Sequence, residues 1–215
     1  MIHDASAEPD HTLSLSVTQI HAYGQNGRLY FGSGVMVAPD RVATNCHVTR
    51  AANAVMVSKG PERLRAVAEQ SDLAHDICIL EVPGAHFPLA KLGSAGQAAV
   101  GGTIYFYGFP RALGMAFSQG RVEALHPFDG SVVIETTADF TQGASGGGLF
   151  DDAGRLIGLA TFMPASQHGH NYAIPVDWIP TVMRTAPHAI EPLTGSPFWE
   201  KGGSLPAFLK VPESE

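Results

Sequence analysis

The chain has 215 residues, of which 45% are hydrophobic and 15% charged, and its formal net charge is −7. This length suits one domain, or one unit built from two small halves. The 13 lysines and arginines are scattered along an acidic chain, so the composition excludes the clustered basic face that binds nucleic acid. No apolar run approaches the ~18 to 20 residues that span a bilayer, so we expect no membrane anchor.

The first part of the chain predicts a series of short strands. Apolar and polar residues alternate from Leu13 to about Tyr23, which is the period of a half-buried strand. Asn26-Gly27 is a hairpin signal, and Leu29–Val37 is the returning strand. A short loop or helical turn begins at His47. Further strands are predicted over residues 54–57, 63–68 and 77–82.

A second set of strands follows a stretch rich in proline and glycine, residues 83–101, which we interpret as a linker. Residues 176–184 carry apolar side chains at helical spacing and predict a short terminal helix. The strands of this set are predicted over residues 103–107, 116–125, 131–137, 148–150, 156–162 and 172–174.

Many short strands without a long helix predict an all-β fold of two antiparallel six-stranded β-barrels packed side by side, with a short C-terminal helix. The predicted domains are an N-terminal barrel over residues 12–95, a C-terminal barrel plus helix over 96–186, and a Pro/Gly-rich tail over 187–215. The alternatives for this tail are a strap held on the surface by Phe198, Trp199 and Phe208 and a disordered end; we favour the strap, because disordered segments seldom carry so many aromatic residues.

A serine surrounded by four glycines lies between two strands of the second half, in Gly143-Ala-Ser145-Gly-Gly-Gly148. In a tight turn the amides of Gly143 and Ser145 can point at one spot, which makes a two-donor pocket for the oxyanion of a tetrahedral intermediate. On this stretch alone, a flexible glycine-rich loop is an equal alternative.

A serine hydroxyl is a weak nucleophile at neutral pH, so the chain must also supply a base and a group that orients the base. His47 is the candidate base, and Asp76, which directly precedes an apolar run, is the candidate orienting group. Asp72 is the rival carboxylate, but it lies several residues before that run. The order His, Asp, Ser is that of the chymotrypsin-like arrangement among convergent triads.

Four segments extend this pattern: Gly32-Ser-Gly-Val, Thr44-Asn-Cys-His47-Val, Asp76-Ile-Cys-Ile-Leu and Gly143-Ala-Ser145-Gly-Gly. In this order they resemble the serial motifs of trypsin-like serine peptidases, more specifically of the bacterial HtrA/Deg type. The resemblance covers roughly residues 13–185 and implies a chymotrypsin-like fold. The chain departs from the family pattern at Ala144, where the family usually has Asn or Asp, so activation by a salt bridge to a freed N-terminal amine is not expected.

The resemblance also implies the walls of a primary specificity pocket, namely Asp139, Phe140, Thr141 and Gln142 on one side and Tyr172, Ala173 and Ile174 on the other. If Phe140 faces the pocket, an apolar P1 residue is expected, whereas Asp139 at its base would favour Lys or Arg. The HtrA-like register favours the apolar reading.

The two cysteines, Cys46 and Cys78, are expected near the triad, with Cys78 on the same strand face as Asp76. We interpret each as a small buried hydrophobe; a bridge between them, or a redox or metal role, are the alternatives. His168 and His170 are interpreted as exposed loop residues, so no metal and no organic cofactor is expected.

The leading hypothesis is a serine endopeptidase that hydrolyses peptide bonds of protein substrates through His47, Asp76 and Ser145 and an acyl-enzyme. The alternative is a latent or partner-activated peptidase, or a peptide-binding module on the same scaffold. The residues after the second barrel are too few for a PDZ domain, and the sequence does not indicate an oligomeric state. The polar start of the chain predicts a cytoplasmic protein if Met1 is the native start, and a periplasmic or secreted one if a leader was removed.

Overall fold

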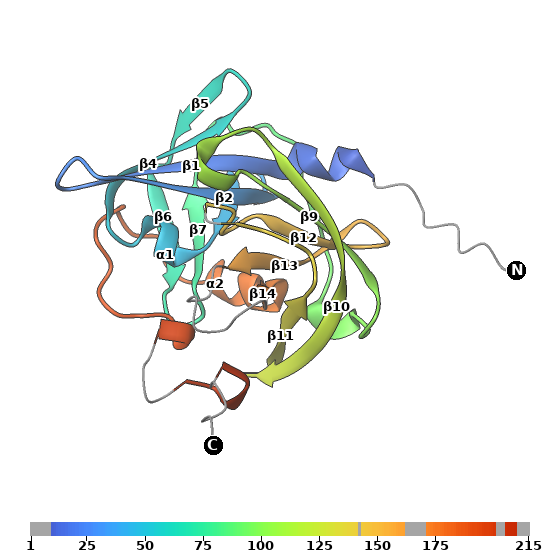
Figure 1. The fold of residues 1–215 in the computed structure, drawn as a ribbon. Coiled ribbons are helices and arrows are strands. Elements are labelled where there is room, and N and C mark those ends of the chain that lie inside the picture. The colour runs from blue at the N-terminus through green and yellow to red at the C-terminus, as the bar shows by residue number, and fades with distance from the viewer. Residues whose placement is uncertain (1–9, 142, 162–170, 201–204, 210–215) are drawn as a thin grey trace, which may run out of the picture.

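The structure, a computed structural model, describes residues 10–141, 143–161, 171–200 and 205–209. Two seven-stranded sheets lie side by side (Figure 1), with the first half of the chain in one and the second half in the other. The predicted all-β architecture of two antiparallel units packed side by side is therefore confirmed. No helix among these residues is long and apolar enough to cross a membrane.

The first sheet has the strand order β5-β4-β1-β2-β3-β7-β6. Its strands are β1 (Val17–Gly24), β2 (Leu29–Ala38), β3 (Arg41–Thr44), β4 (Ala52–Lys59), β5 (Glu62–Arg65), β6 (Ala68–Asp72) and β7 (Ile77–Glu81). The short helix α1 (Cys46–Thr49) follows β3. Neither edge strand pairs with the other, so this half is an open half-barrel rather than the closed six-stranded barrel predicted.

The chain between β5 and β6 explains why one predicted strand, residues 63–68, became two. The Ala66 amide donates to Val55 of β4, whereas the next amide, Val67, donates to Glu81 of β7. The backbone therefore leaves one edge of the sheet and joins the other within two residues.

The second sheet closes on itself, because β12 pairs with both β9 and β13. Its strands are β8 (Lys91–Leu92), β9 (Thr103–Gly108), β10 (Ala116–Phe128), β11 (Ser131–Thr136), β12 (Gly148–Asp151), β13 (Arg155–Thr161) and β14 (Asn171–Pro175). β8 lies before the expected boundary at residue 95, yet it pairs with β13. The second sheet thus begins inside the segment interpreted as a linker.

The remaining elements are short. They are the 3-10 turns η1 (His11–Ser16), η2 (Ala95–Gln97), η3 (Pro110–Ala112), η4 (Val176–Trp178), η5 (Phe198–Glu200) and η7 (Ala207–Leu209), and the helix α2 (Ile179–Val182). The predicted terminal helix corresponds to η4 and α2. The strand predicted from Leu13 is wrong in its first four residues: Asp10 accepts the amide of Thr12 at 2.9 Å and caps η1, so β1 starts only at Val17.

The largest hydrophobic cluster joins the two halves. It contains Val35 and Ile77 from the first sheet and Tyr107 and Phe150 from the second, all nearly inaccessible to solvent. Burial of this apolar surface between the sheets fixes how the segments carrying His47, Asp76 and Ser145 face one another.

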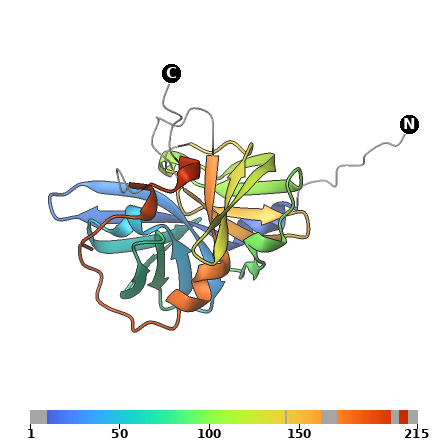
Figure 2. The same ribbon diagram turned by 90° about the horizontal axis from the view of Figure 1, so that it is seen from below.

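Residues 187–200, called the strap here, follow α2 and run round the outside of the first sheet (Figures 1 and 2). The strap pairs with the edge strand β6, because the amides of Glu69 and His188 each donate to the carbonyl of the other, at 2.9 and 2.8 Å. Phe198 and Trp199 are 5% and 7% exposed, and Phe208 stacks on His126 with centroids 4.4 Å apart. In the described part of the tail, the contacts expected of these three aromatic residues are present, with Phe198 and Trp199 in the strap and Phe208 in η7.

Glu69 is a buried acid beneath the strap, and it provides a test of this packing. Its side chain is inaccessible to solvent, the Thr49 hydroxyl donates to Oε2 at 3.4 Å, and Oε1 has no hydrogen-bond partner among the described residues. Burial raises the pKa of Glu69 from 4.5 to about 7, although His188 and the Thr49 hydrogen bond oppose the shift.

Because the pKa is raised on folding, Glu69 opposes folding once the pH exceeds its unfolded value, and the full penalty is present above about pH 7. Glu69→Gln should therefore increase the free energy of unfolding at pH 8 by up to about 3 kcal/mol, with little change near pH 4. Urea unfolding at both pH values measures this. Glu62→Gln on exposed β5 is the control and should show no such difference; an equal effect of Glu69→Gln at both pH values would contradict the assignment.

Candidate active site

Adjacent strands bring His47 and Asp76 together. β3 pairs with β7 so that Thr44 lies opposite Cys78; His47 follows β3 and Asp76 precedes β7. His47 Nδ1 lies 2.7 Å from Asp76 Oδ2, and the His47 amide donates to Oδ1 at 2.8 Å. One carboxylate thus binds both the ring and the backbone of the same histidine, which fixes the ring orientation.

Asp76 adopts a left-handed backbone conformation with φ +62°, one residue before β7 begins. The expectation that Asp76 and Cys78 share a strand face is therefore wrong. The Asp76 carbonyl accepts from the Asn45 side chain at 3.1 Å and from the Cys46 amide at 3.2 Å. These bonds hold a conformation that is unusual for a residue other than glycine.

Two further donors to Asp76 come from distant parts of the chain. Thr161, at the end of β13, donates its hydroxyl to Oδ2 at 3.3 Å, and Trp199, in the strap, donates its indole N–H at 3.1 Å. Sequence reasoning missed both: it placed Thr161 only within a strand and Trp199 only as a packing aromatic. Neither residue lies in a pattern that refers to Asp76.

Ser33 of β2 fastens the loop that carries Ser145. Its amide donates to the Ser145 carbonyl at 2.8 Å, and its hydroxyl donates to the Gly143 carbonyl at 3.4 Å and accepts from the Phe109 amide at 2.8 Å. A Cβ on Gly146, whose φ is +83°, would lie 2.1 Å from the Ser33 carbonyl oxygen. Glycine is therefore required where the loop meets β2.

The amides of Gly143 and Ser145 donate to no other described residue. The neighbouring amides do have acceptors: the Ala144 amide donates to the Thr141 carbonyl at 2.9 Å, and the Gly146 amide donates to the Ala160 carbonyl at 2.8 Å. Gly143 has φ +90°. Two unused amides beside a hydroxyl that is nearly buried are available to an anion that forms at Ser145.

Within the described residues, no hydrogen bond joins the Ser145 hydroxyl to His47. The His47 side chain is 17% exposed, while that of Asp76 is fully buried. Contacts between a nucleophile and its base commonly tighten only when substrate binds, so the predicted roles of Ser145 and His47 do not require this bond in the chain alone.

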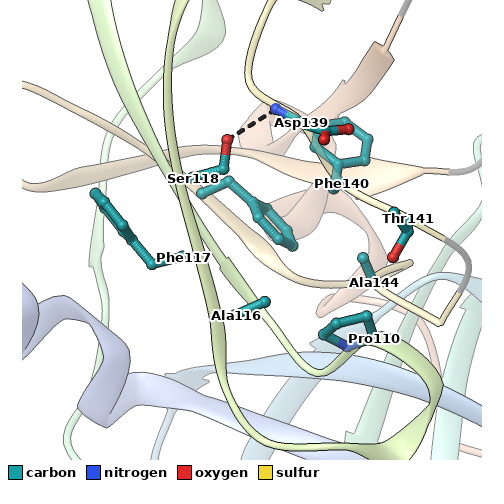
Figure 3. Close-up of a pocket in the computed structure, with 9 residues that line it drawn as sticks. Pro110, Ala116, Phe117, Ser118, Asp139, Phe140, Thr141 and Ala144 are labelled. Atoms are coloured by element: carbon teal, nitrogen blue, oxygen red, sulfur yellow. Dashed lines mark hydrogen bonds between the residues drawn. The ribbon is translucent and has the colours of Figure 1, made fainter.

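A cavity of about 370 Å³ lies beside the Ser145 loop (Figure 3). Phe140 is buried and packs against Phe106 with centroids 5.1 Å apart, whereas Asp139 is exposed and its amide donates to the Ser118 hydroxyl at 2.8 Å. The lining residues are Phe106, Pro110, Ala116, Phe117, Ser118, Asp139, Phe140, Thr141 and Ala144.

Only part of the predicted specificity pocket borders this cavity. Tyr172, Ala173 and Ile174 lie in β14, paired with β11 and β13, and do not line it. Gln142 and the segment 162–170 between β13 and β14 lie outside the described residues. The primary specificity pocket therefore stays a prediction.

The sequence of residues 32–159, more than half of the chain, matches the trypsin-like peptidase domain. The chain belongs to this family. Serine endoprotease DegS of Haemophilus influenzae is 31% identical over 166 residues, which are 71% of this chain and 49% of DegS. Serine protease Rv3671c of Mycobacterium tuberculosis is 31% identical over 140 residues, 60% of this chain and 35% of its own length.

Solved structures show the same fold. The active form of the Rv3671c protease from M. tuberculosis superposes with a TM-score of 0.75 at 24% identity, covering 86% of each chain. The HtrA-type protease AlgW with a tripeptide gives 0.73 at 25% identity, covering 82% of this chain and 63% of AlgW. This chain spans about half or less of the length of the curated relatives it matches.

In this trypsin-like peptidase domain the two cysteines form a disulfide, Cys46–Cys78. The interpretation of each as a separate buried hydrophobe is thus wrong, and the alternative of a bridge is correct. The pairing of β3 with β7 places the Cα atoms of Cys46 and Cys78 4.9 Å apart, a separation that a disulfide can span. The bridge ties the residue before His47 to the residue two after Asp76.

Asp72, the rival carboxylate, binds a different histidine. Asp72 Oδ2 lies 2.6 Å from His75 Nδ1, and Asp129 of the β10–β11 turn lies 2.7 Å from Nε2. The Asp72 hydrogen bond, and then the charges of both carboxylates, raise the pKa of His75 against the opposing effect of burial. His75 therefore joins the two sheets one residue before Asp76.

Among the described residues, no group of three or more His, Cys, Asp or Glu side chains could hold a metal ion. His168 and His170 lie outside those residues.

The disulfide should support stability more than chemistry. Replacing both cysteines, Cys46→Ala with Cys78→Ala, frees a loop with a sequence separation of 32 and should cost about 3 to 4 kcal/mol. At a temperature where the variant is folded, at least about a tenth of kcat should remain, because neither sulfur takes part in proton transfer. Calorimetry of the variant, and of the wild type with a thiol reductant, measures the first effect. An unchanged melting temperature in reductant would contradict it.

Proposed function

We propose that this chain is a serine endopeptidase with Ser145 as nucleophile, His47 as general base and then acid, and Asp76 as the group that orients His47. The observation that carries the proposal is the pairing of His47 with a fully buried Asp76, together with a Ser145 loop in which the amides of Gly143 and Ser145 have no described acceptor. The family to which the chain belongs supports the same reading.

In the proposed reaction, Ser145 Oγ attacks the carbonyl carbon of a peptide bond while His47 Nε2 takes its proton. The negative charge on the carbonyl oxygen is stabilised by the amides of Gly143 and Ser145. His47 then gives the proton to the leaving amine, which departs and leaves an acyl-enzyme. Water, deprotonated by His47, attacks the ester and releases the second product.

The alternatives are a peptidase that needs a partner to become active, and a binding module. Two features favour an active form. The His47–Asp76 pair is assembled within this chain alone, and no neighbouring carbonyl among the described residues occupies the Gly143 and Ser145 amides.

A fluorophosphonate probe tests the nucleophile. The wild type should be labelled and Ser145→Ala should not, since the probe forms its bond to an activated serine oxygen. Ser131→Ala on β11 is the control and should be labelled like wild type. Loss of any triad side chain should lower kcat for casein by about 10⁴-fold or more. Labelling that persists in Ser145→Ala would reject the assignment, and labelling only after a partner is added would favour the latent alternative.

We further propose that the substrate residue before the cleaved bond is apolar. Phe140 is buried among apolar side chains, while Asp139 is exposed and so is poorly placed to form the base of a pocket for a cation. Peptides that differ only at P1 measure this preference: kcat/KM should be higher for Leu or Val than for Lys, by about tenfold or more. A higher value for Lys would reverse the conclusion.

We propose an oxidising compartment, periplasmic or secreted, as the place of action. A Cys46–Cys78 disulfide persists where thiols are not kept reduced. Several relatives are named periplasmic serine endoproteases, which agrees with this proposal.

A further inference from the structure

Trp199 lies beyond the segment that matches the family, yet it contacts two of the proposed catalytic side chains. Its indole N–H donates to Asp76 Oδ2 at 3.1 Å, and its ring meets that of His47 edge to face, with centroids 5.2 Å apart and planes at 88°. We propose that Trp199 is a positioning residue that holds the Asp76 carboxylate toward His47. This inference rests on the proposed function.

A buried charge needs hydrogen-bond donors from the protein. Asp76 has no exposed surface, so its carboxylate must be satisfied by protein donors. Oδ1 accepts from the His47 amide, and Oδ2 accepts from His47, Thr161 and Trp199. An indole is a donor only, so Trp199 cannot accept the proton that His47 must direct at Asp76. A water molecule in the same place could donate or accept, and would fix neither oxygen.

The strap is anchored on both sides of Trp199. The residue before Trp199, Phe198, donates its amide to the carbonyl of Ala74, two residues before Asp76, at 2.9 Å. The residue after it, Glu200, forms a two-bond ion pair with Arg50, three residues after His47, at 2.6 and 2.8 Å. The indole is therefore tied on both sides to the two segments whose geometry it would maintain.

A structural role alone would predict a different result from a positioning role. If the Trp199 ring only covers apolar surface, the loss of its N–H should change stability and leave turnover unaltered. If the N–H positions Asp76, its loss should lower kcat and leave KM nearly unchanged, because a bond to Asp76 acts on the proton-transfer step and not on substrate binding.

The chain offers a matched control in Trp178, which is 9% exposed and donates its indole N–H to the carbonyl of Asp129 at 3.2 Å. Trp199→Phe and Trp178→Phe each remove one indole hydrogen bond and keep a large ring. We expect Trp199→Phe to lower kcat about tenfold, the effect of one hydrogen bond to a charged group, and Trp178→Phe to stay within about twofold of wild type. Equal kcat values for both variants would overturn the proposal.

A second variant covers the case in which Trp199→Phe does not fold. Glu200→Gln weakens the ion pair to Arg50 and should lower kcat about threefold. The double variant Arg50→Glu with Glu200→Arg exchanges the two charges, so its kcat should lie between those of Glu200→Gln and wild type. Glu62→Gln, on exposed β5, is the control for the removal of one acid. Wild-type kcat in Glu200→Gln would count against the anchoring of Trp199.

A spectroscopic readout is independent of activity. The two tryptophans give two indole N–H signals in a ¹H–¹⁵N spectrum, and Asp76→Asn should move the Trp199 signal and not that of Trp178. A Trp199 signal that does not respond would refute the contact. If wild type neither hydrolyses peptides nor reacts with the fluorophosphonate, the proposed function fails; a normally active wild type with an unaffected Trp199→Phe refutes only the positioning role.

Discussion

The constraint on which this structure depends is the complete burial of one carboxylate. A charge without access to water is tolerated only if the protein supplies several donors with good geometry. Around Asp76 those donors come from α1, from the end of β13 and from the strap, which are far apart in sequence. The pairing of β3 with β7, the left-handed backbone of Asp76 and the disulfide all serve to keep the acceptor in one place.

The second constraint is the junction between the sheets, where Ser33 binds the loop that carries Ser145. β2, which pairs with the strand β3 that precedes His47, therefore also fixes the position of the proposed nucleophile. Close packing explains the glycines at this point better than flexibility does, because a Cβ on Gly146 would meet the Ser33 carbonyl oxygen and a Cβ on Gly32 would lie 2.5 Å from the Val48 side chain. The proposed base and the proposed nucleophile belong to different sheets, but the segments of both contact β2.

Alternation of apolar residues located most strands, and the spacing of His47, Asp76 and Ser145 indicated the site, because both follow from local rules. The pairing of residues that are far apart in the chain follows no such local rule. The open edge of the first sheet depends on where residues 66 and 67 place their amides, and the disulfide depends on the register of β3 with β7. Thr161 and Trp199 could not be assigned to Asp76 because a single hydroxyl or indole carries no signal of its acceptor. The cap at Asp10 does follow a local rule, since Asp is a common residue at the start of a helical turn.

The position of the strap in the chain also determines when, during synthesis, the surroundings of Asp76 are completed. The ribosome makes His47, Asp76 and Ser145 before it makes Trp199, so the surroundings of Asp76 are completed by a segment that follows the whole second sheet in the chain. Until that segment arrives, Asp76 lacks one donor and the outer cover of its pair with His47. The proposed site therefore reaches its final geometry only after both sheets have been synthesised.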